Sequence, residues 1–238
     1  NEDEENKFYE KTLSIIFNPD PKSLWKNIPS NSEDLYWKKD DVAEIYSLEE
    51  KTVLVASKRG RSHANKGSFR DDDYTIKHFT ENNWSLVAVS DGAGSAVLGL
   101  KGAEIACKAV ADFFQNYFNE NSSSTFDKEI LEYKNSKKAL VEIKNEFLKA
   151  SKFAHQEIQD FADKMENALK DFHATLIFTL LKKFDFGYAI LAFGVGDCPI
   201  GVVNKDQTSA ALMNKIDVGE FGGGTRFITM PEICLLYT

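Results

Sequence analysis

Three acidic residues stand where a divalent cation could be bound. Asp72 is the middle member of a run of three acids, and Asp91 and Asp197 each follow an apolar stretch that is typical of a buried strand. Carboxylate and carbonyl oxygens are the ligands that Mg²⁺ and Mn²⁺ prefer, and Gly92 offers a backbone carbonyl directly after Asp91. A solvated acidic turn, or a tight turn at Gly92, would explain each feature alone. Together, the three acids at strand ends predict a metal site.

The elements that would position these residues follow from the hydrophobic pattern. Apolar residues that recur every three or four positions predict helices over 97–118 and 136–171, with a surface loop at 119–125. Short runs of β-branched and aromatic residues predict strands. The strands are expected at 51–57, 84–90, 174–181, 187–195, 200–203, 210–213 and 226–229, and Tyr74 and Ile76 suggest a further strand directly after the acidic run. Strands, then two helices packed side by side, then more strands indicate an α+β fold rather than alternating βαβ units.

The composition narrows the class of protein. The chain has 238 residues, of which 28% are charged and 42% hydrophobic, and its formal net charge is −8. The longest apolar runs fall far short of the roughly 20 residues that cross a bilayer, so we expect no membrane partner. The negative charge, without a dense basic cluster, argues against nucleic acid as a partner. The acidic, polar start of the sequence is unlike a secretory signal, and a cytoplasmic protein is expected.

The sequence predicts two segments. A polar N-terminal helical arm with an irregular stretch is expected over 1–50, because its apolar residues recur near helical spacing until Asn18-Pro-Asp-Pro21 breaks the pattern, and one domain is expected over 51–238. The residues that carry this spacing are Phe8, Leu13, Ile16 and Phe17. The cysteines lie far apart without a C-x-x-C pair, which predicts reduced, buried thiols rather than disulfides or a structural zinc site. These cysteines are Cys107, Cys198 and Cys234.

The order and spacing of several motifs resemble the metal-dependent serine/threonine protein phosphatases of the protein phosphatase 2C family, especially its bacterial branch. The resemblance covers the chain from about Val53 to Thr238. The motifs in chain order are Gly60-Arg-Ser-His63 with Gly67, Asp71-Asp72-Asp73-Tyr74, Ser90-Asp91-Gly92-Ala-Gly-Ser95 with Lys101-Gly-Ala-Glu104, His173-Ala-Thr-Leu176, Gly194-Val-Gly-Asp197, and Gly219-Glu-Phe with Thr225-Arg-Phe227. Their shared order, with strands and helices between them, carries the resemblance.

The resemblance implies a sandwich of two antiparallel β-sheets flanked by helices, with a metal cleft at one end. By position, Asp72 is similar to the family's first metal ligand and Asp91 to its bridging ligand. Gly92 is similar to the residue that adds a backbone carbonyl, and Asp197 resembles an acid that can hold a third ion. A complete site would bind two or three Mn²⁺ or Mg²⁺ ions. A metal-activated water would then hydrolyse phosphoserine or phosphothreonine in a phosphorylated protein substrate.

A histidine and three arginines are further candidates within this resemblance. His63 matches a Ser-His pair of the bacterial branch and could donate a proton to the leaving oxygen, although a histidine with a structural hydrogen bond is the alternative. Arginine suits phosphate because its guanidinium fork matches two phosphoryl oxygens. Gly67 occupies the position, five residues before the first metal aspartate, where many family members have this arginine. Arg59, Arg61 and Arg70 remain candidates, with none preferred.

The end of the sequence departs from the family's pattern. In the family, a strand like 233–238 continues into an Asp-Gly turn that supplies another metal ligand, whereas the sequence given stops at Thr238. We therefore expect a phosphatase-like domain that lacks its C-terminal part. Two hypotheses follow: a metal-dependent protein phosphatase that acts in signalling, and a non-catalytic phosphatase-like binding or regulatory module with an incomplete metal site.

Overall fold

The computed structural model of the chain describes residues 12–15, 20–120, 124–133, 140–216, 224–231 and 233. Several predicted features lie outside these residues: the helical spacing at Phe8, Ile16 and Phe17, the motif at Gly219, and nearly all of the strand at 233–238. Leu13 is described, and it is exposed and not helical. In the part of the chain that the structure describes, no helix is long and apolar enough to cross a membrane.

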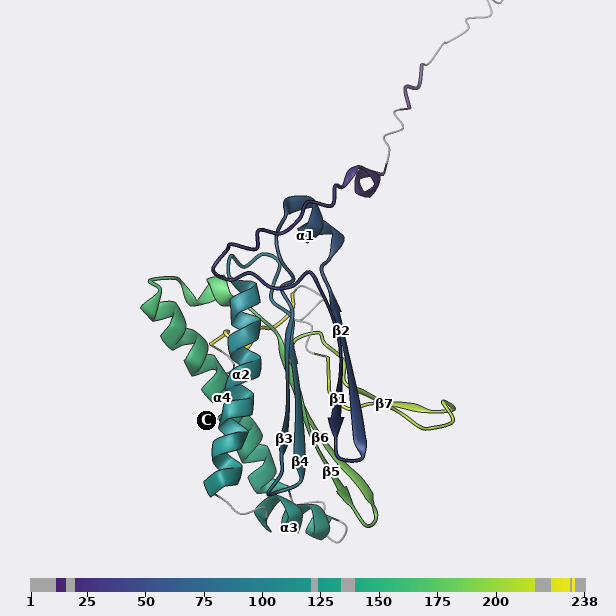
Figure 1. Cartoon of the computed structure of the whole chain (residues 1–238), viewed down its shortest axis with the longest axis vertical. Helices are drawn as coiled ribbons and strands as arrows, with labels where there is room; N and C mark the ends of the chain where they lie inside the picture. The colour runs from purple at the N-terminus through teal and green to yellow at the C-terminus, as the bar shows by residue number, and fades with distance from the viewer. Residues whose placement is uncertain are drawn as a thin grey trace, which may run out of the picture.

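A four-stranded antiparallel sheet forms the middle layer (Figure 1). Its strands run in the order β3 (Asp73–Phe79), β4 (Trp84–Ser90), β5 (Leu176–Phe184) and β6 (Gly187–Val195). β4 and β6 begin and end where the sequence predicts. Their bounds are well defined because apolar, β-prone residues are followed directly by turn residues.

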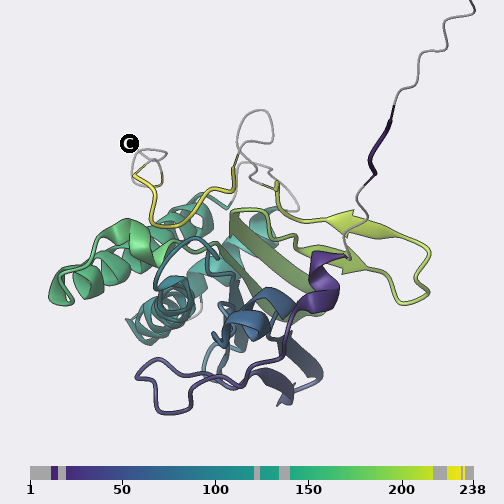
Figure 2. The same ribbon diagram turned by 90° about the horizontal axis from the view of Figure 1, so that it is seen from above.

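Two long helices cover one face of this sheet (Figures 1 and 2). α2 and α4 pack against each other, and α2 also contacts β3 and β4. The helices are α1 (Arg61–Lys66), α2 (Gly99–Glu120), α3 (Ser124–Tyr133) and α4 (Val141–Lys164), with 3₁₀ turns at Pro21–Leu24 and Leu169–Phe172. The predicted pair of long helices is confirmed, with the second helix shorter than the predicted range.

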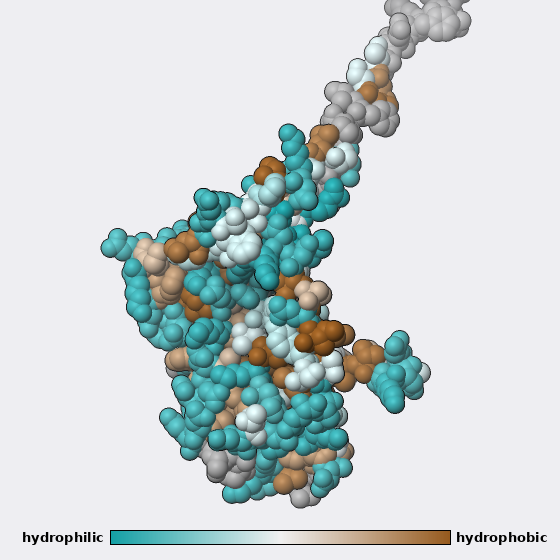
Figure 3. All heavy atoms as spheres, viewed as in Figure 1, coloured by the Kyte–Doolittle hydropathy of each residue, from teal (hydrophilic) through white to brown (hydrophobic). Residues whose placement is uncertain are grey.

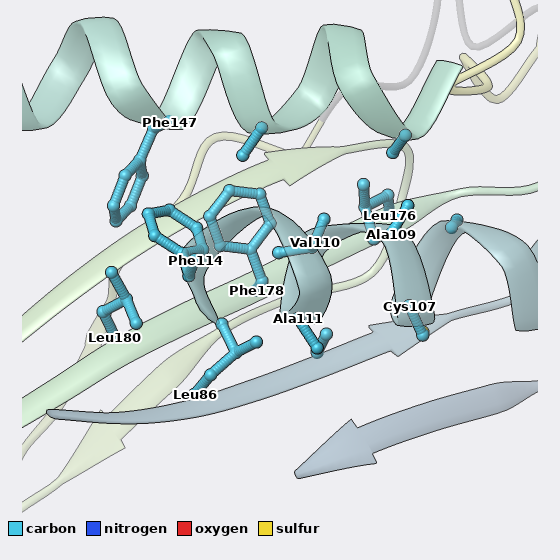
Figure 4. Close-up of a cluster of buried hydrophobic side chains, with 14 of the residues drawn as sticks. Leu86, Cys107, Ala109, Val110, Ala111, Phe114, Phe147, Leu176, Phe178 and Leu180 are labelled. Atoms are coloured by element: carbon cyan, nitrogen blue, oxygen red, sulfur yellow. The ribbon is translucent and has the colours of Figure 1, made fainter. Parts of the chain in front are cut away.

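The core lies between the sheet and these helices. Every second residue of β4 and β5 points toward α2 and α4, because successive side chains of a strand alternate between its two faces. Figure 4 shows Phe114 of α2 between Phe147 of α4 and Phe178 of β5, with ring centroids 5.6 and 5.8 Å away. Burying one such side chain fully contributes roughly 1.5–3 kcal/mol, so this cluster holds the helices to the sheet.

A β-hairpin lies on the opposite face of the sheet. β1 (Asp41–Leu48) pairs in antiparallel fashion with β2 (Lys51–Lys58). The assignment of residues 41–48 to a helical arm is therefore wrong. These residues form a strand because β2 follows after a tight turn, in which Glu49 adopts a φ of 55°.

The hairpin contacts the sheet mainly through polar groups at its rim. The Tyr74 hydroxyl of β3 donates a hydrogen bond to Glu44 of β1, and the Tyr188 hydroxyl of β6 donates one to Glu50, at 3.0 and 3.3 Å. Apolar side chains are exposed over the hairpin (Figure 3). Among them are the paired residues Ile45 and Leu54, which are 72% and 73% exposed.

The remaining elements complete a mixed fold with antiparallel sheets, compatible with the predicted sandwich. A small hairpin consists of β7 (Gly201–Val203) and β8 (Ala210–Leu212). The strand predicted at 226–229 is absent there: the segment forms a turn, anchored by a 2.9 Å hydrogen bond from the Ile228 N–H to the Ala174 carbonyl beside β5. α3 was not predicted, and it begins inside the expected loop at 119–125.

Candidate metal site

The sheet gathers the three predicted acidic ligands at one end. In the observed register, β3 and β5 begin at the edge where β4 and β6 end. Asp72 directly precedes β3, Asp91 directly follows β4, and Asp197 lies two residues beyond β6. Asp72 and Asp91 also line one hollow of about 480 Å³ between the sheet and the β1–β2 hairpin. The site therefore opens into a cavity beside a row of acids.

The electrostatics of this cluster favour the binding of a cation. Partial burial, followed by the charge of Asp72 and a hydrogen bond with it, raises the pKa of Asp91 from 3.8 to about 6. Asp197 and Asp71 add to the rise through their charges. Crowded carboxylates that retain a proton are stabilised when a cation replaces it. The donor set of carboxylate oxygens thus fits a hard divalent cation such as Mg²⁺ or Mn²⁺.

Gly92 occupies a position where no side chain fits. A Cβ atom there would lie 2.5 Å from the backbone of Gly99 and 2.8 Å from the carbonyl oxygen of Asp71. Gly92 forms an isolated antiparallel bridge with Ala174, and the two hydrogen bonds of this bridge, both 2.8 Å, are made by the residues on either side. The bridge therefore does not use the Gly92 carbonyl, which fits its predicted role as a ligand.

Asp197 and Cys198 extend the cluster away from Asp72. Asp91, Asp197 and Cys198 each place one ligand atom within 4.8 Å of the others. The expectation that the cysteines are buried is confirmed for Cys107 and wrong for Cys198, which is half-buried, while Cys234 lies outside the described residues. The position of Cys198, directly after an acid at the end of a strand, is the feature of the sequence that could have marked it as a candidate ligand.

Lys38 is a site residue that the sequence did not indicate. Its ammonium donates hydrogen bonds to Asp73 Oδ2 and to the Leu100 carbonyl, both at 2.8 Å, and lies 3.4 Å from the Asp72 carbonyl oxygen. Only 11% of the Lys38 side chain is exposed. The lysine neutralises Asp73 and leaves Asp72 as the acid beside Asp91. Nothing in the sequence marks Lys38, because it belongs to an irregular segment far from the motifs.

His63 is held at the border of the cluster. It lies on α1, with Nε2 3.5 Å from Asp71 Oδ2 and Nδ1 3.1 Å from the Ser68 hydroxyl. Burial raises the pKa of Asp71, and His63 opposes that rise. Both ring nitrogens therefore have protein partners, which orients the imidazole. This geometry suits a proton carrier as well as a histidine with a structural role.

The three candidate arginines differ in their surroundings. Arg70 is buried, and its guanidinium donates hydrogen bonds to the Ser57 hydroxyl at 2.6 Å and to the Lys39 carbonyl at 2.8 Å. The guanidinium of Arg59 donates to the Ser68 carbonyl and to a nearby asparagine. Arg61 is exposed at the start of α1. Arg70 and Arg59 therefore bind acceptors within the protein, and these hydrogen bonds hold the loops around the site.

Comparison with known proteins gives one family. The family model described as Protein phosphatase 2C matches residues 59–234 of this chain. That match covers about three quarters of the sequence and includes all of the acids described above. No curated protein matches the chain.

Proposed function

Because the chain belongs to the protein phosphatase 2C family, we propose that it is a metal-dependent protein phosphatase that removes phosphate from phosphoserine or phosphothreonine. The observation that carries this proposal is the contact between Asp72 and Asp91 at the mouth of a hollow of about 480 Å³. A phosphorylated protein is the proposed partner. A structural acidic cluster would gain nothing from holding two carboxylates so close that the charge of one raises the pKa of the other.

The proposed ligands divide into two groups. Asp72, Asp91 and the Gly92 carbonyl would hold Mn²⁺ or Mg²⁺, and Asp197 would contribute to a further, weaker ion. When bound, such ions supply Lewis acidity toward water and the phosphoryl group. Lys38 forms an ion pair with Asp73. Arg70 donates a hydrogen bond to the Asp72 carbonyl and another to the Ser57 hydroxyl, which in turn contacts the Asp72 carboxylate.

His63 is the proposed proton donor. Its contact with Asp71 fixes the position of Nε2, and its contact with Ser68 fixes the tilt of the ring. Asp71 also raises the pKa of Asp91, so the histidine and its carboxylate lie beside the metal ligands. His63 Nε2, oriented by Asp71, would then give its proton to a leaving serine or threonine oxygen.

Hydrolysis of synthetic phosphopeptides tests the proposal. We expect phosphate release from phosphothreonine and phosphoserine peptides that requires Mn²⁺ or Mg²⁺ and is abolished by EDTA. Asp72→Asn and Asp91→Asn should each abolish it, whereas Asp185→Asn, in the exposed turn between β5 and β6, should not. If a folded chain binds the phosphopeptide but never releases phosphate with either metal, the non-catalytic hypothesis replaces this one.

A further inference from the structure

We propose that Cys198 makes the outer corner of the acidic cluster a site for a thiophilic divalent cation such as Zn²⁺ or Cd²⁺. The ligands are carboxylate oxygens of Asp91 and Asp197 and the Cys198 sulfur, which lie within 4.8 Å of one another. Zn²⁺ lies about 2.0–2.3 Å from oxygen and sulfur ligands, so one ion reaches all three donors after small side-chain adjustments. The inference rests on the proposed function only in that Asp91 and Asp197 belong to both sites.

The turn after β6 brings two successive side chains to the cluster. Gly196 adopts a φ of +108°, and a Cβ atom there would lie 2.6 Å from the Thr175 methyl group. The chain therefore reverses against β5 at a residue without a side chain. Asp197 and Cys198 follow directly, and their ligand atoms both meet Asp91.

The sulfur is held in place by its neighbours. Thr175, which is 1% exposed, accepts a 2.9 Å hydrogen bond from the Asp91 N–H, and its hydroxyl lies 3.4 Å from Cys198 Sγ. Asn214 donates a 2.9 Å hydrogen bond to the Cys198 carbonyl. One buried hydroxyl thus joins the backbone of Asp91 to the thiol of Cys198. Little reorganisation is needed to bind an ion between them.

The mixed donor set selects among metals. A thiolate is a soft ligand that favours Zn²⁺ and Cd²⁺, whereas Mg²⁺ and Mn²⁺ favour sites of oxygen alone. As the metal–sulfur bond forms, the thiol proton passes to the buffer. An ion at the sulfur corner uses the same Asp91 carboxylate that contacts Asp72. Zinc would therefore compete with the catalytic cation and inhibit the enzyme.

Titration of the purified chain with Cd²⁺ tests the site directly, because cadmium–sulfur bonds give an ultraviolet charge-transfer band. We expect this band in the wild-type chain and its loss in Cys198→Ser, with Cd²⁺ affinity lower by about 10²-fold and Mn²⁺ affinity little changed. Cys107→Ala and Cys234→Ser are the controls and should keep the band. A band of equal strength in Cys198→Ser, or its loss in a control that remains folded, would overturn the proposal.

Asp197→Asn provides a second variant that leaves every thiol in place. It should weaken Cd²⁺ binding while the band persists at saturating Cd²⁺, and unchanged affinity would contradict the three-ligand site. The readout is independent of catalysis. If no form of the chain hydrolyses phosphopeptides with Mn²⁺, the proposed function fails, yet a band that depends on Cys198 would still support the thiophilic site.

Discussion

Replacing Asp91 by asparagine should stabilise the metal-free protein. A carboxyl group whose pKa rises on folding binds its proton more tightly in the native state, so native stability falls as the pH rises through that pKa. For Asp91 the rise from 3.8 to about 6 corresponds to about 3 kcal/mol as an upper limit. Because Asp91 is exposed to solvent, screening reduces the expected gain in Asp91→Asn to about 1 kcal/mol.

Thermal unfolding in EDTA measures this gain. Near pH 7.5, Asp91→Asn should unfold about 2–4 °C above the wild type, and the difference should shrink as the pH falls below about 6 and vanish below 3.8, where the wild-type carboxyl group is protonated in both states. Asp185→Asn removes an exposed acid outside the cluster and should shift the midpoint little. With Mn²⁺ the wild type should unfold at the higher temperature of the two, because Mn²⁺ binds to its native state and stabilises it.

Two results would refute this reasoning. If Asp91→Asn unfolds at a lower temperature than the wild type in EDTA near neutral pH, the Asp91 carboxylate stabilises the metal-free fold instead of destabilising it. If the gain is the same at acidic and neutral pH, it does not come from ionisation.

Three further predictions concern the site and its support. His63→Ala should slow the hydrolysis of alkyl phosphate esters by roughly 10²-fold, and that of aryl esters with good leaving groups far less. Equal losses on both substrates in a stopped assay would show that His63 positions the substrate and does not donate the proton. Gly92→Ala should lower the free energy of unfolding in urea by about 2 kcal/mol or more and abolish Mn²⁺ binding, because the added Cβ atom would lie 2.5 Å from backbone atoms. Gly94→Ala is the control and should have neither effect, because a Cβ atom there has no neighbour within 4 Å. Glu129→Ala should cost about 1 kcal/mol in the same unfolding assay, because the Glu129 carboxylate accepts hydrogen bonds from the N–H groups of Glu142 and Ile143 in the first turn of α4. Glu132→Ala, at an exposed position of α3, the helix that also carries Glu129, is the control, and equal effects would contradict a capping role.

The sequence predicted the central sheet better than the elements that depend on distant contacts. β4 and β6 are recognisable because their own residues are apolar and end at turns. α3 is not, since its serine-rich start is typical of a loop. It is held by tertiary contacts: Asp127 accepts hydrogen bonds from Trp84 and Lys182. Tertiary interactions of this kind override local propensity.

β1 was missed for a related reason, although the strand predicted at 51–57 is present as β2. The turn residues Glu49 and Glu50 are not typical of a two-residue hairpin turn, where asparagine and glycine dominate. The strand pattern of β1 is also weak, because Glu44 and the exposed Ile45 interrupt the alternation. Only the pairing with β2 reveals the strand, and pairing cannot be derived from one segment alone.

The candidate ligands that lie next to strands could be predicted from the sequence. The residues that hold these ligands in place, and that come from other parts of the chain, could not. Asp72, Asp91 and Asp197 are each adjacent to a predicted strand, so an antiparallel register brings them together. Lys38 reaches the site from an irregular segment, and its three acceptors are visible only in the structure. Cys198 was interpreted as a buried thiol because the cysteines lie far apart in the sequence, without a C-x-x-C pair.

The β1–β2 hairpin has a consequence for how the protein opens locally. It touches the sheet mainly through rim hydrogen bonds around a hollow, while β4 and β5 are packed under α2 and α4. Segments with few buried apolar contacts open at a free energy below that of global unfolding. Amide protons of the hairpin should therefore exchange with solvent through small fluctuations that leave the core closed. Ser57 of β2 contacts Asp72, so the proposed first metal ligand would be loosened in each such opening while Asp91 and Asp197 stay fixed.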